Sequence, residues 1–137
     1  MKIFQTTVFF GFLSISNLLF SQSTDYETLS SEEDQAGKYK SYTASNDVTY
    51  SIGDTLYFTE PSSENGTYIS SQKMDITAKP LPFDSAENGK YSVIQTIKVS
   101  GSLEQGYMVG FITKGELIDA NYLIFIEYGI ESQEIKQ

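Results

Sequence analysis

Short runs in which apolar and polar residues alternate fill the chain from residue 39 onward. Val48, Tyr50 and Ile52 alternate with polar neighbours. After an intervening Gly-Asp pair, Leu56 and Phe58 continue the alternation. A period of two places successive side chains on opposite faces of a strand, so each run predicts a half-buried β-strand. Because no segment of this region shows a helical stripe of useful length, the pattern restricts the chain to a β-rich fold.

The same pattern predicts five or six strands joined by turns. We expect them near residues 48–52, 56–58, 67–71, 91–99, 107–111 and 122–126. On the fourth of these, Tyr91, Val93, Ile97 and Val99 are expected to share one face. The last run is almost continuously apolar, which is typical of a central strand covered on both faces. Residues 73–90 contain two prolines and a polar cluster, and these indicate a long loop.

A sheet of this size has to curl, because open edges on a short all-β domain promote aggregation. We therefore predict an all-β fold in the form of a small barrel, with a compact β-sandwich as the alternative. The 137 residues suffice for one domain, to which we assign residues 39–137. A short C-terminal helical turn is expected within residues 127–135, where Tyr128, Ile130 and Ile135 are available to close an open end of the barrel.

The first 21 residues have the pattern of a secretory signal peptide. One lysine precedes an apolar run over residues 3–20, and a small residue follows it. We place the cleavage between Ser21 and Gln22, with the bond after Ser23 as the next candidate. The protein is then exported to the periplasm or the extracellular medium, without membrane insertion after cleavage. The alternative is an uncleaved membrane anchor, because the run just reaches the length of a membrane span.

Residues 22–38 follow this leader and are strongly acidic. They contain five acids and few apolar residues. The apolar surface that such a stretch buries does not offset the entropy lost when it becomes ordered. We therefore expect a disordered acidic linker, with a brief helix capped by Ser30 or Ser31 as the alternative.

The residue types that the chain lacks limit its chemistry. It has no Cys, His or Trp, and its nine basic residues are all Lys, against 18 acids and a net charge of −9. Without Cys and His it lacks a thiol nucleophile, the commonest general base and the usual zinc ligands. The acidic balance repels the phosphates of nucleic acid. We therefore expect no enzyme activity, no cofactor, no metal and no nucleic-acid partner.

Several local patterns still resemble reactive or binding motifs. A carboxylate-based glycan hydrolase is the remote alternative, and the acids nearest the apolar strands are Asp54, Glu60, Asp119 and Glu127. Asp54 follows a glycine in a tight turn, which predicts that its carboxylate accepts backbone hydrogen bonds. Ser70 and Lys73 have the Ser-x-x-Lys spacing but do not open a helix. Residues 84–90 match only part of a calcium loop, so a solvated turn is expected. Residues 65–67 match the glycosylation acceptor pattern.

Three blocks of the sequence, YSIGDTLYFTEPS (50–62), VIQTIKVSGS (93–102) and YLIFIEYGIESQEI (122–135), together resemble small secreted bacterial proteins that carry an SH3-like β-domain. The resemblance implies an SH3-like barrel and supplies no catalytic residues. In that group the last block usually ends in Gly-Glu-Ile, whereas this chain has Gln133 in the place of the glycine. The LysM peptidoglycan-binding module also contains Gly-Asp-Thr-Leu, but a helix follows there, which Pro61 disfavours here.

Tyrosine is abundant in the predicted domain and provides the candidate ligand contacts. Its ring combines a flat apolar face with a polar tip, which suits stacking on sugars and contact with proteins. We single out Tyr57, then Tyr107 and Tyr122, with packing in the sheet as the alternative for each. The function that we expect is an exported, non-enzymatic binding or interaction module of the bacterial cell envelope or secretome, with a protein or a cell-envelope glycan as partner. The alternative is a structural or stress-related envelope protein without a dedicated ligand.

Overall fold

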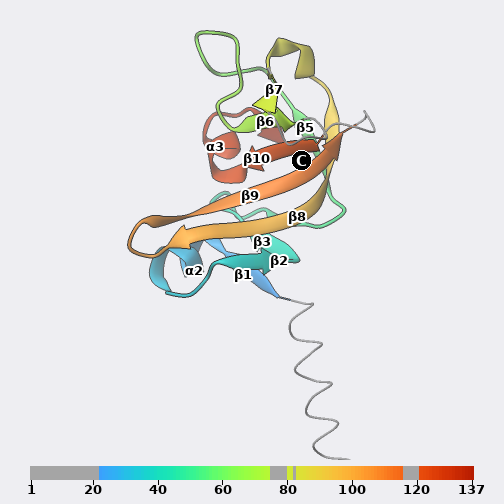
Figure 1. Ribbon diagram of the computed structural model, residues 1–137. Helices are drawn as coiled ribbons and strands as arrows, with labels where there is room; N and C mark the ends of the chain where they lie inside the picture. Colours follow the sequence, from blue (N-terminus) through green and yellow to red (C-terminus); the bar gives the residue numbers. More distant parts are fainter. Residues whose placement is uncertain (1–21, 75–79, 82, 116–120) are drawn as a thin grey trace, which may run out of the picture.

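The computed structural model describes residues 22–74, 80–81, 83–115 and 121–137, and its architecture is mostly β (Figure 1). The strands are β1 (Ser23–Asp25), β2 (Gly37–Tyr39), β3 (Ser41–Thr43), β4 (Thr49–Ser51), β5 (Thr55–Phe58), β6 (Ser71–Met74), β7 (Pro80–Leu81), β8 (Tyr91–Ser102), β9 (Gly106–Gly115), β10 (Asn121–Phe125) and β11 (Ile135–Lys136). The helices are α2 (Tyr26–Ser31) and α3 (Ile126–Glu131), with a 3₁₀ turn η1 (Ser85–Glu87).

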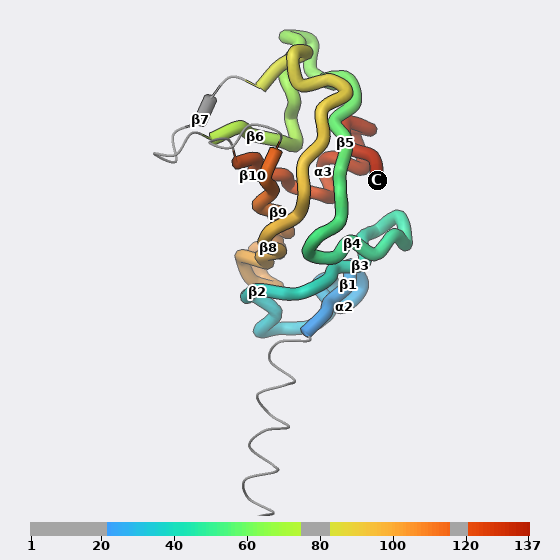
Figure 2. The backbone as a smooth tube through the Cα atoms, turned by 90° about the vertical axis from the view of Figure 1, so that its right-hand side faces the viewer, coloured from blue at the N-terminus to red at the C-terminus, as the bar shows by residue number. Residues whose placement is uncertain are grey.

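A long antiparallel hairpin, β8 and β9, forms the centre of the larger sheet. Beyond β8 the sheet continues through β5 to β11, and beyond β9 it continues through β10 and β6 to β7, while β2 also pairs with β8. The sheet curls around the core, and α3 follows β10 at its open side (Figures 1 and 2). A small sheet of order β1-β3-β4 lies with α2 at one end of the hairpin. The predicted curled, mostly β fold with a short C-terminal helix is thereby confirmed.

The face that β8 turns toward the core changes at a β-bulge. The register of the β8–β9 ladder shifts between Ile94 and Thr96. Ile94 before the bulge and Ile97 after it are both fully buried. The prediction that Tyr91 and Val93 share the inner face with Ile97 is therefore wrong, because the extra residue reverses the alternation. Tyr91 is exposed and Val93 is only half-buried.

Residues 22–38, expected to form a disordered linker, instead contain β1, α2 and β2. β1 pairs in parallel with β3, and Leu29 of α2 is buried in the core. The helix is capped by Asp25, whose Oδ1 accepts a hydrogen bond from the N–H of Thr28 at 2.7 Å, and not by a serine. The expectation of disorder is wrong because strand pairing, capping and one buried leucine offset the ordering entropy of a polar segment.

Aromatic rings from four separate segments of the chain pack together in the core. The ring centroid of Phe58 lies 5.0 Å from that of Phe83, 5.1 Å from that of Tyr122 and 5.9 Å from that of Tyr68. Tyr68 donates a hydrogen bond from its hydroxyl to the carbonyl of Thr59, and burial raises its pKa to about 12. The tyrosines of this core are therefore structural donors as well as apolar rings.

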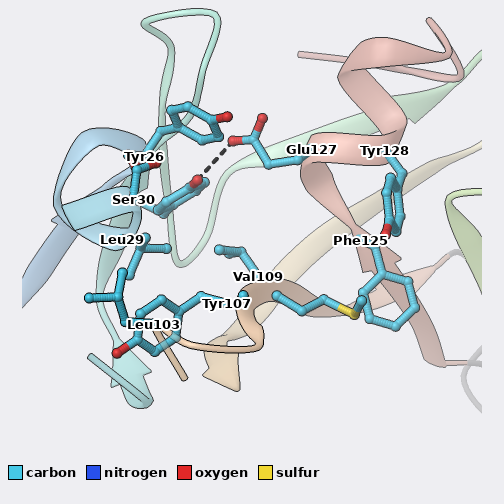
Figure 3. A pocket seen from close by; sticks show the side chains of 12 residues that line it. Tyr26, Leu29, Ser30, Leu103, Tyr107, Val109, Phe125, Glu127 and Tyr128 are labelled. Carbon is cyan, nitrogen blue, oxygen red and sulfur yellow. Dashed lines mark hydrogen bonds between the residues drawn. The ribbon is translucent and has the colours of Figure 1, made fainter. Parts of the chain in front are cut away.

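The predicted C-terminal helical turn is confirmed as α3. Ile130 packs against the core and Ile135 is buried, as expected for side chains that close the end of the curled sheet. Tyr128 differs from the expectation, because 47% of its surface is exposed. It lies on the side of α3 that faces α2 and the tip of the hairpin (Figure 3).

The end of α3 is a Schellman motif. The N–H of Gln133 donates to the carbonyl of Ile130 at 3.2 Å, and the N–H of Glu134 donates to the carbonyl of Gly129 at 3.1 Å. Gln133 has φ 62°, in the left-handed region that favours glycine. The turn therefore forms with a glutamine in this position, and its backbone carries strain.

Candidate functional site

A groove of about 360 Å³ opens between α2, the tip of the β8–β9 hairpin and α3 (Figure 3). Side chains of α2 form one wall, and side chains at the start of α3 form the opposite wall. We call this hollow the aromatic groove and define it by Tyr26, Leu29, Tyr107, Phe125, Glu127 and Tyr128. The groove brings α2 and α3 together, although these helices are about 100 residues apart in the chain. Only the tertiary fold places them side by side.

Each wall contains two residues that are three apart in the chain, on α2 in one wall and at the junction of β10 and α3 in the other. Tyr26 and Leu29 occupy adjacent positions on one face of α2, and Leu29 is buried whereas Tyr26 is 47% exposed. Phe125 and Tyr128 flank the start of α3, with ring centroids 6.4 Å apart and planes at 67°. The edge-to-face contact favours one orientation of the Tyr128 ring. The groove thus has an apolar floor and two accessible tyrosine rings on facing walls.

Tyr107 is held at the hairpin tip by the segment that precedes β2. Its hydroxyl accepts a hydrogen bond from the N–H of Gln35 at 3.2 Å, and the carbonyl of Gln35 accepts one from the hydroxyl of Tyr39 at 2.6 Å. Burial, followed by the neighbouring Tyr107, raises the pKa of Tyr39. The acidic segment therefore acts as a strap that positions a ring of the groove.

Glu127 is the charged residue among those that line the groove. Its Oε1 accepts hydrogen bonds from the hydroxyl of Tyr42 at 2.8 Å and from the N–H of Ser45 at 3.1 Å, and the Ser45 hydroxyl donates to Oε2. Burial, followed by the hydrogen bond to Glu127 and its charge, raises the pKa of Tyr42. Tyr42 therefore remains a hydrogen-bond donor at neutral pH and holds the Glu127 carboxylate at the groove.

A smaller hollow of about 240 Å³ adjoins the groove, because Tyr26 lines both. Its other lining residues include Asp25, Glu27 and Asp47. Together with Glu127, these acids are the charged side chains among the described residues that line the two hollows, and none of those residues is basic. Tyrosine faces next to carboxylates provide stacking surfaces and hydrogen-bond acceptors for a polar or cationic ligand.

The three tyrosines predicted as ligand contacts lie in three different environments. Tyr107 lines the aromatic groove. Tyr57 is 40% exposed on β5 and packs against Tyr91 at 6.4 Å, but it is not among the residues that line the groove. Tyr122 is 1% exposed, and its hydroxyl donates to Oε2 of Glu87 at 3.3 Å. Tyr122 belongs to the core, so the prediction of a ligand contact there is wrong.

The partial calcium-loop pattern over residues 84–90 is a mostly exposed turn, as predicted, but one of its residues, Glu87, is buried in an ion-pair cluster. Glu87 is 4% exposed, and its carboxylate lies 3.3 Å from Nζ of Lys73 and 3.5 Å from Nζ of Lys90. In the described ranges, no group of three or more His, Cys, Asp or Glu residues is placed to hold a metal ion. Ser70 donates its hydroxyl to Glu134 at 2.5 Å, so Ser70 and Lys73 are engaged with different carboxylates.

The acids considered for glycan hydrolysis do not share one environment. Asp54 accepts a hydrogen bond from the N–H of Ser51 at 2.8 Å, which confirms its predicted role in the turn. Glu60 is exposed and Glu127 lies at the aromatic groove. Asp119 lies outside the described residues. The described positions of Asp54, Glu60 and Glu127 therefore do not support a shared carboxylate site.

A further carboxylate, Glu134, is completely enclosed beyond the end of α3. It accepts hydrogen bonds from the N–H and hydroxyl of Ser62 at 3.0 and 2.6 Å, and from the N–H of Ile69 at 2.9 Å. The N–H and hydroxyl of Ser70 add two more at 3.0 and 2.5 Å. Burial alone would raise its pKa, but the donors outweigh burial, so the pKa of Glu134 lies below its ordinary value. This residue ties the 62–70 loop to the C-terminus.

Most of the groove was missed by reasoning from the sequence. Tyr26 and Leu29 lie in the stretch read as a linker, and Tyr128 was assigned to closing the barrel. The available signal was local. Asp25 is a good N-cap, and Tyr26 and Leu29, which are three residues apart, would share one face of a helix that begins there. Nothing in that signal indicated that this face would lie opposite α3.

Comparisons with known proteins do not identify the groove. The chain matches no family model, no curated protein and no solved structure. Among the described residues, no helix has the length and apolar character needed to cross a membrane. The interpretation of function therefore depends on the geometry and chemistry of the groove.

Proposed function

We propose that this protein is an exported, non-enzymatic binding module and that the aromatic groove is its binding site. The observation that carries the proposal is the pair of 47% exposed rings, Tyr26 and Tyr128, on facing walls of a groove with an apolar floor. Concave sites with apolar lining and a few placed polar groups are the usual form of a ligand site. Glu127 supplies the placed polar group. A protein segment or a cell-envelope glycan would both use such a surface.

Export is proposed from the N-terminal pattern, with cleavage between Ser21 and Gln22. Cleavage at this bond leaves the carbonyl of Gln22, which accepts a hydrogen bond from the N–H of Lys40 at 2.8 Å. Cleavage after Ser23 would remove that contact and the first residue of β1. The intact mass of the protein recovered from an exporting bacterium tests the assignment. A retained leader would favour the membrane-anchored alternative.

We also propose that the fold is related to the SH3-like domain of small secreted bacterial proteins. The three blocks that carry the resemblance meet in the larger sheet: 50–62 contains β5, 93–102 lies in β8, and 122–135 contains most of β10, all of α3 and the first residue of β11. β5 pairs with both β8 and β11. This adjacency supports the relation, and an experimental structure with the strand order of an SH3-like barrel would test it.

A retention assay with envelope extract tests the binding function. The immobilised protein is compared with Tyr128→Ala, which removes a ring from one wall of the groove, and with Tyr57→Ala, which removes a ring of similar exposure elsewhere. We expect the native protein and Tyr57→Ala to retain the same component and Tyr128→Ala to retain at least about tenfold less. Equal retention by all three would contradict the assignment of the groove and favour a structural protein without a dedicated ligand.

A further inference from the structure

We propose that the aromatic groove binds a basic segment of a partner protein, with an apolar side chain in the groove and a neighbouring Lys or Arg at its acidic side. This inference rests on the proposed binding function and specifies its ligand. The groove supplies the docking surface, and the charges around it select the occupant.

The apolar part of the groove suits one large side chain of a partner. Its floor contains the buried residues Leu29 and Val109, and Met108, which also lines the groove, is 40% exposed. A methionine side chain is flexible and polarisable, so it adapts to apolar partners of different shape. Tyr26 and Tyr128 stand on either wall and add accessible ring faces. These features accommodate an apolar or aromatic anchor residue of a peptide.

The charges next to this apolar surface favour a cationic neighbour of the anchor. Glu127 lies in the groove, and Glu27 and Asp47 are exposed in the adjoining hollow. Tyr26 lines both hollows, so a Lys or Arg that passes from one to the other meets a ring face as well as carboxylates. Such a cation gains from both the ring quadrupole and the acids.

The same charges disfavour the other ligand classes that use aromatic surfaces. A neutral glycan stacks on tyrosine but gains no charge attraction from the acids, and a phosphate-bearing or acidic glycan is repelled by them. The chain as a whole carries a net charge of −9, which extends this preference to the approach of the partner. Charge complementarity therefore selects a basic peptide over a glycan.

Fluorescence anisotropy with three labelled probes tests this inference. The probes are the peptide Lys-Leu-Lys-Phe-Lys-Leu and two matched peptides in which Ser or Glu replaces each Lys. We expect the Lys peptide to bind at least about tenfold more tightly than the Ser peptide and the Glu peptide not to bind. Raising the salt concentration from about 0.05 M to about 0.5 M should weaken binding of the Lys peptide several-fold.

Four variants connect that binding to the groove. Tyr26→Ala and Glu127→Gln should each weaken binding of the Lys peptide about tenfold. Tyr57→Ala and Glu131→Gln are the matched controls, because they remove an exposed ring and an exposed acid outside the groove lining, and they should change affinity less than about twofold. Equal affinity for the Lys and Ser peptides, or equal weakening by all four variants, would overturn the proposal.

A chito-oligosaccharide serves as the glycan arm of the experiment and separates this inference from the broader function. If the oligosaccharide binds and Tyr26→Ala abolishes its binding, while the Lys peptide does not bind, the ligand assignment is wrong and the binding function stands. If neither probe binds and retention from envelope extract is the same for Tyr128→Ala as for the native protein, both proposals are wrong.

Discussion

The two carboxylates at opposite ends of α3 are seven residues apart in the chain and lie in contrasting environments. Glu134 is completely buried, and five donors from the 62–70 loop surround its two oxygens. Glu127 is half-buried at the aromatic groove, and its donors come from Tyr42 and Ser45. The oxygens of Glu134 are enclosed by hydrogen-bond donors, whereas the side chain of Glu127 also lines a hollow with exposed rings.

This difference separates a structural acid from a candidate functional acid. A buried carboxylate is tolerated only when donors satisfy it, and removing its charge leaves those donors without an equivalent acceptor. A half-exposed carboxylate is solvated already, so its removal affects stability less. We therefore expect substitutions near Glu134 to act on stability and substitutions near Glu127 to act on binding.

The largest expected effect is the loss of stability in Glu134→Gln. An amide has one acceptor oxygen and presents its NH₂ group to donors from Ser62, Ile69 or Ser70, so we expect the free energy of unfolding to fall by about 3 kcal/mol. Glu127→Gln should cost about 1 kcal/mol or less, because its oxygen still accepts from Tyr42. Urea denaturation measures both. Glu131→Gln removes the same charge from an exposed position and is the control; similar losses in all three variants would refute the contrast.

Acid sensitivity should depend on the same buried carboxylate. The pKa of Glu134 in the folded protein lies below its ordinary value of 4.5, so the unfolded chain takes up the proton first as the pH falls. The contribution of Glu134 is therefore complete above about pH 4.5 and is lost as the pH falls through the folded-state pKa. Denaturation curves recorded across this range should show a smaller decline for Glu134→Gln than for the native protein. Parallel declines would show that other groups cause the acid sensitivity.

A smaller change of opposite sign is expected at the turn between the two carboxylates. Gln133 adopts φ 62°, so Gln133→Gly should relieve backbone strain and raise the free energy of unfolding by about 1 kcal/mol. The hydrogen bond from Thr59 to the carbonyl of Gln133, at 2.5 Å, uses the main chain and is kept. Thermal denaturation measures the gain. A loss of stability would mean that the glutamine side chain contributes more than its strained backbone costs.

The smallest stability effect is expected at the groove itself. Tyr128 is 47% exposed, so Tyr128→Ala should change the free energy of unfolding by less than about 0.5 kcal/mol. The same substitution should strongly reduce retention of a partner, which is the reverse of the behaviour of Glu134→Gln. Denaturation and binding are measured on one preparation. A large loss of stability in Tyr128→Ala would show that this ring stabilises the fold, as Glu134 does.

Local patterns in the sequence correctly predicted the parts of the fold that depend on neighbouring residues. Alternation located β4, β5 and β9, a continuous apolar run located β10, and the Gly53-Asp54 pair identified a tight turn in which Gly53 has φ 94°. The C-terminal helical turn was also predicted from a short local segment. The inner face of β8 was mispredicted, because the bulge between Ile94 and Thr96 reverses which side chains face the core. The residue types in this strand do not reveal that a bulge is present.

The site was less predictable than the fold. Of the three tyrosines chosen from the sequence, Tyr107 reaches the groove, Tyr57 lies on another surface and Tyr122 is in the core. All three lie on strands, and the residue type alone does not show which ring reaches the surface. The rings on the groove walls come from Tyr26 and Tyr128, which belong to short helices whose mutual position depends on how the hairpin curls.

Residue order and composition were sufficient to predict a curled, mostly β fold with a C-terminal helix. The period of the side chains and the turn residues determine secondary structure within a few neighbouring positions. The composition also defined an acidic chain without Cys, His or Arg. Long-range packing was required to order residues 22–38, to bury Glu134 and to place Tyr26 opposite Tyr128. Such outcomes depend on contacts between residues far apart in the chain, and a single sequence carries no direct record of those distances.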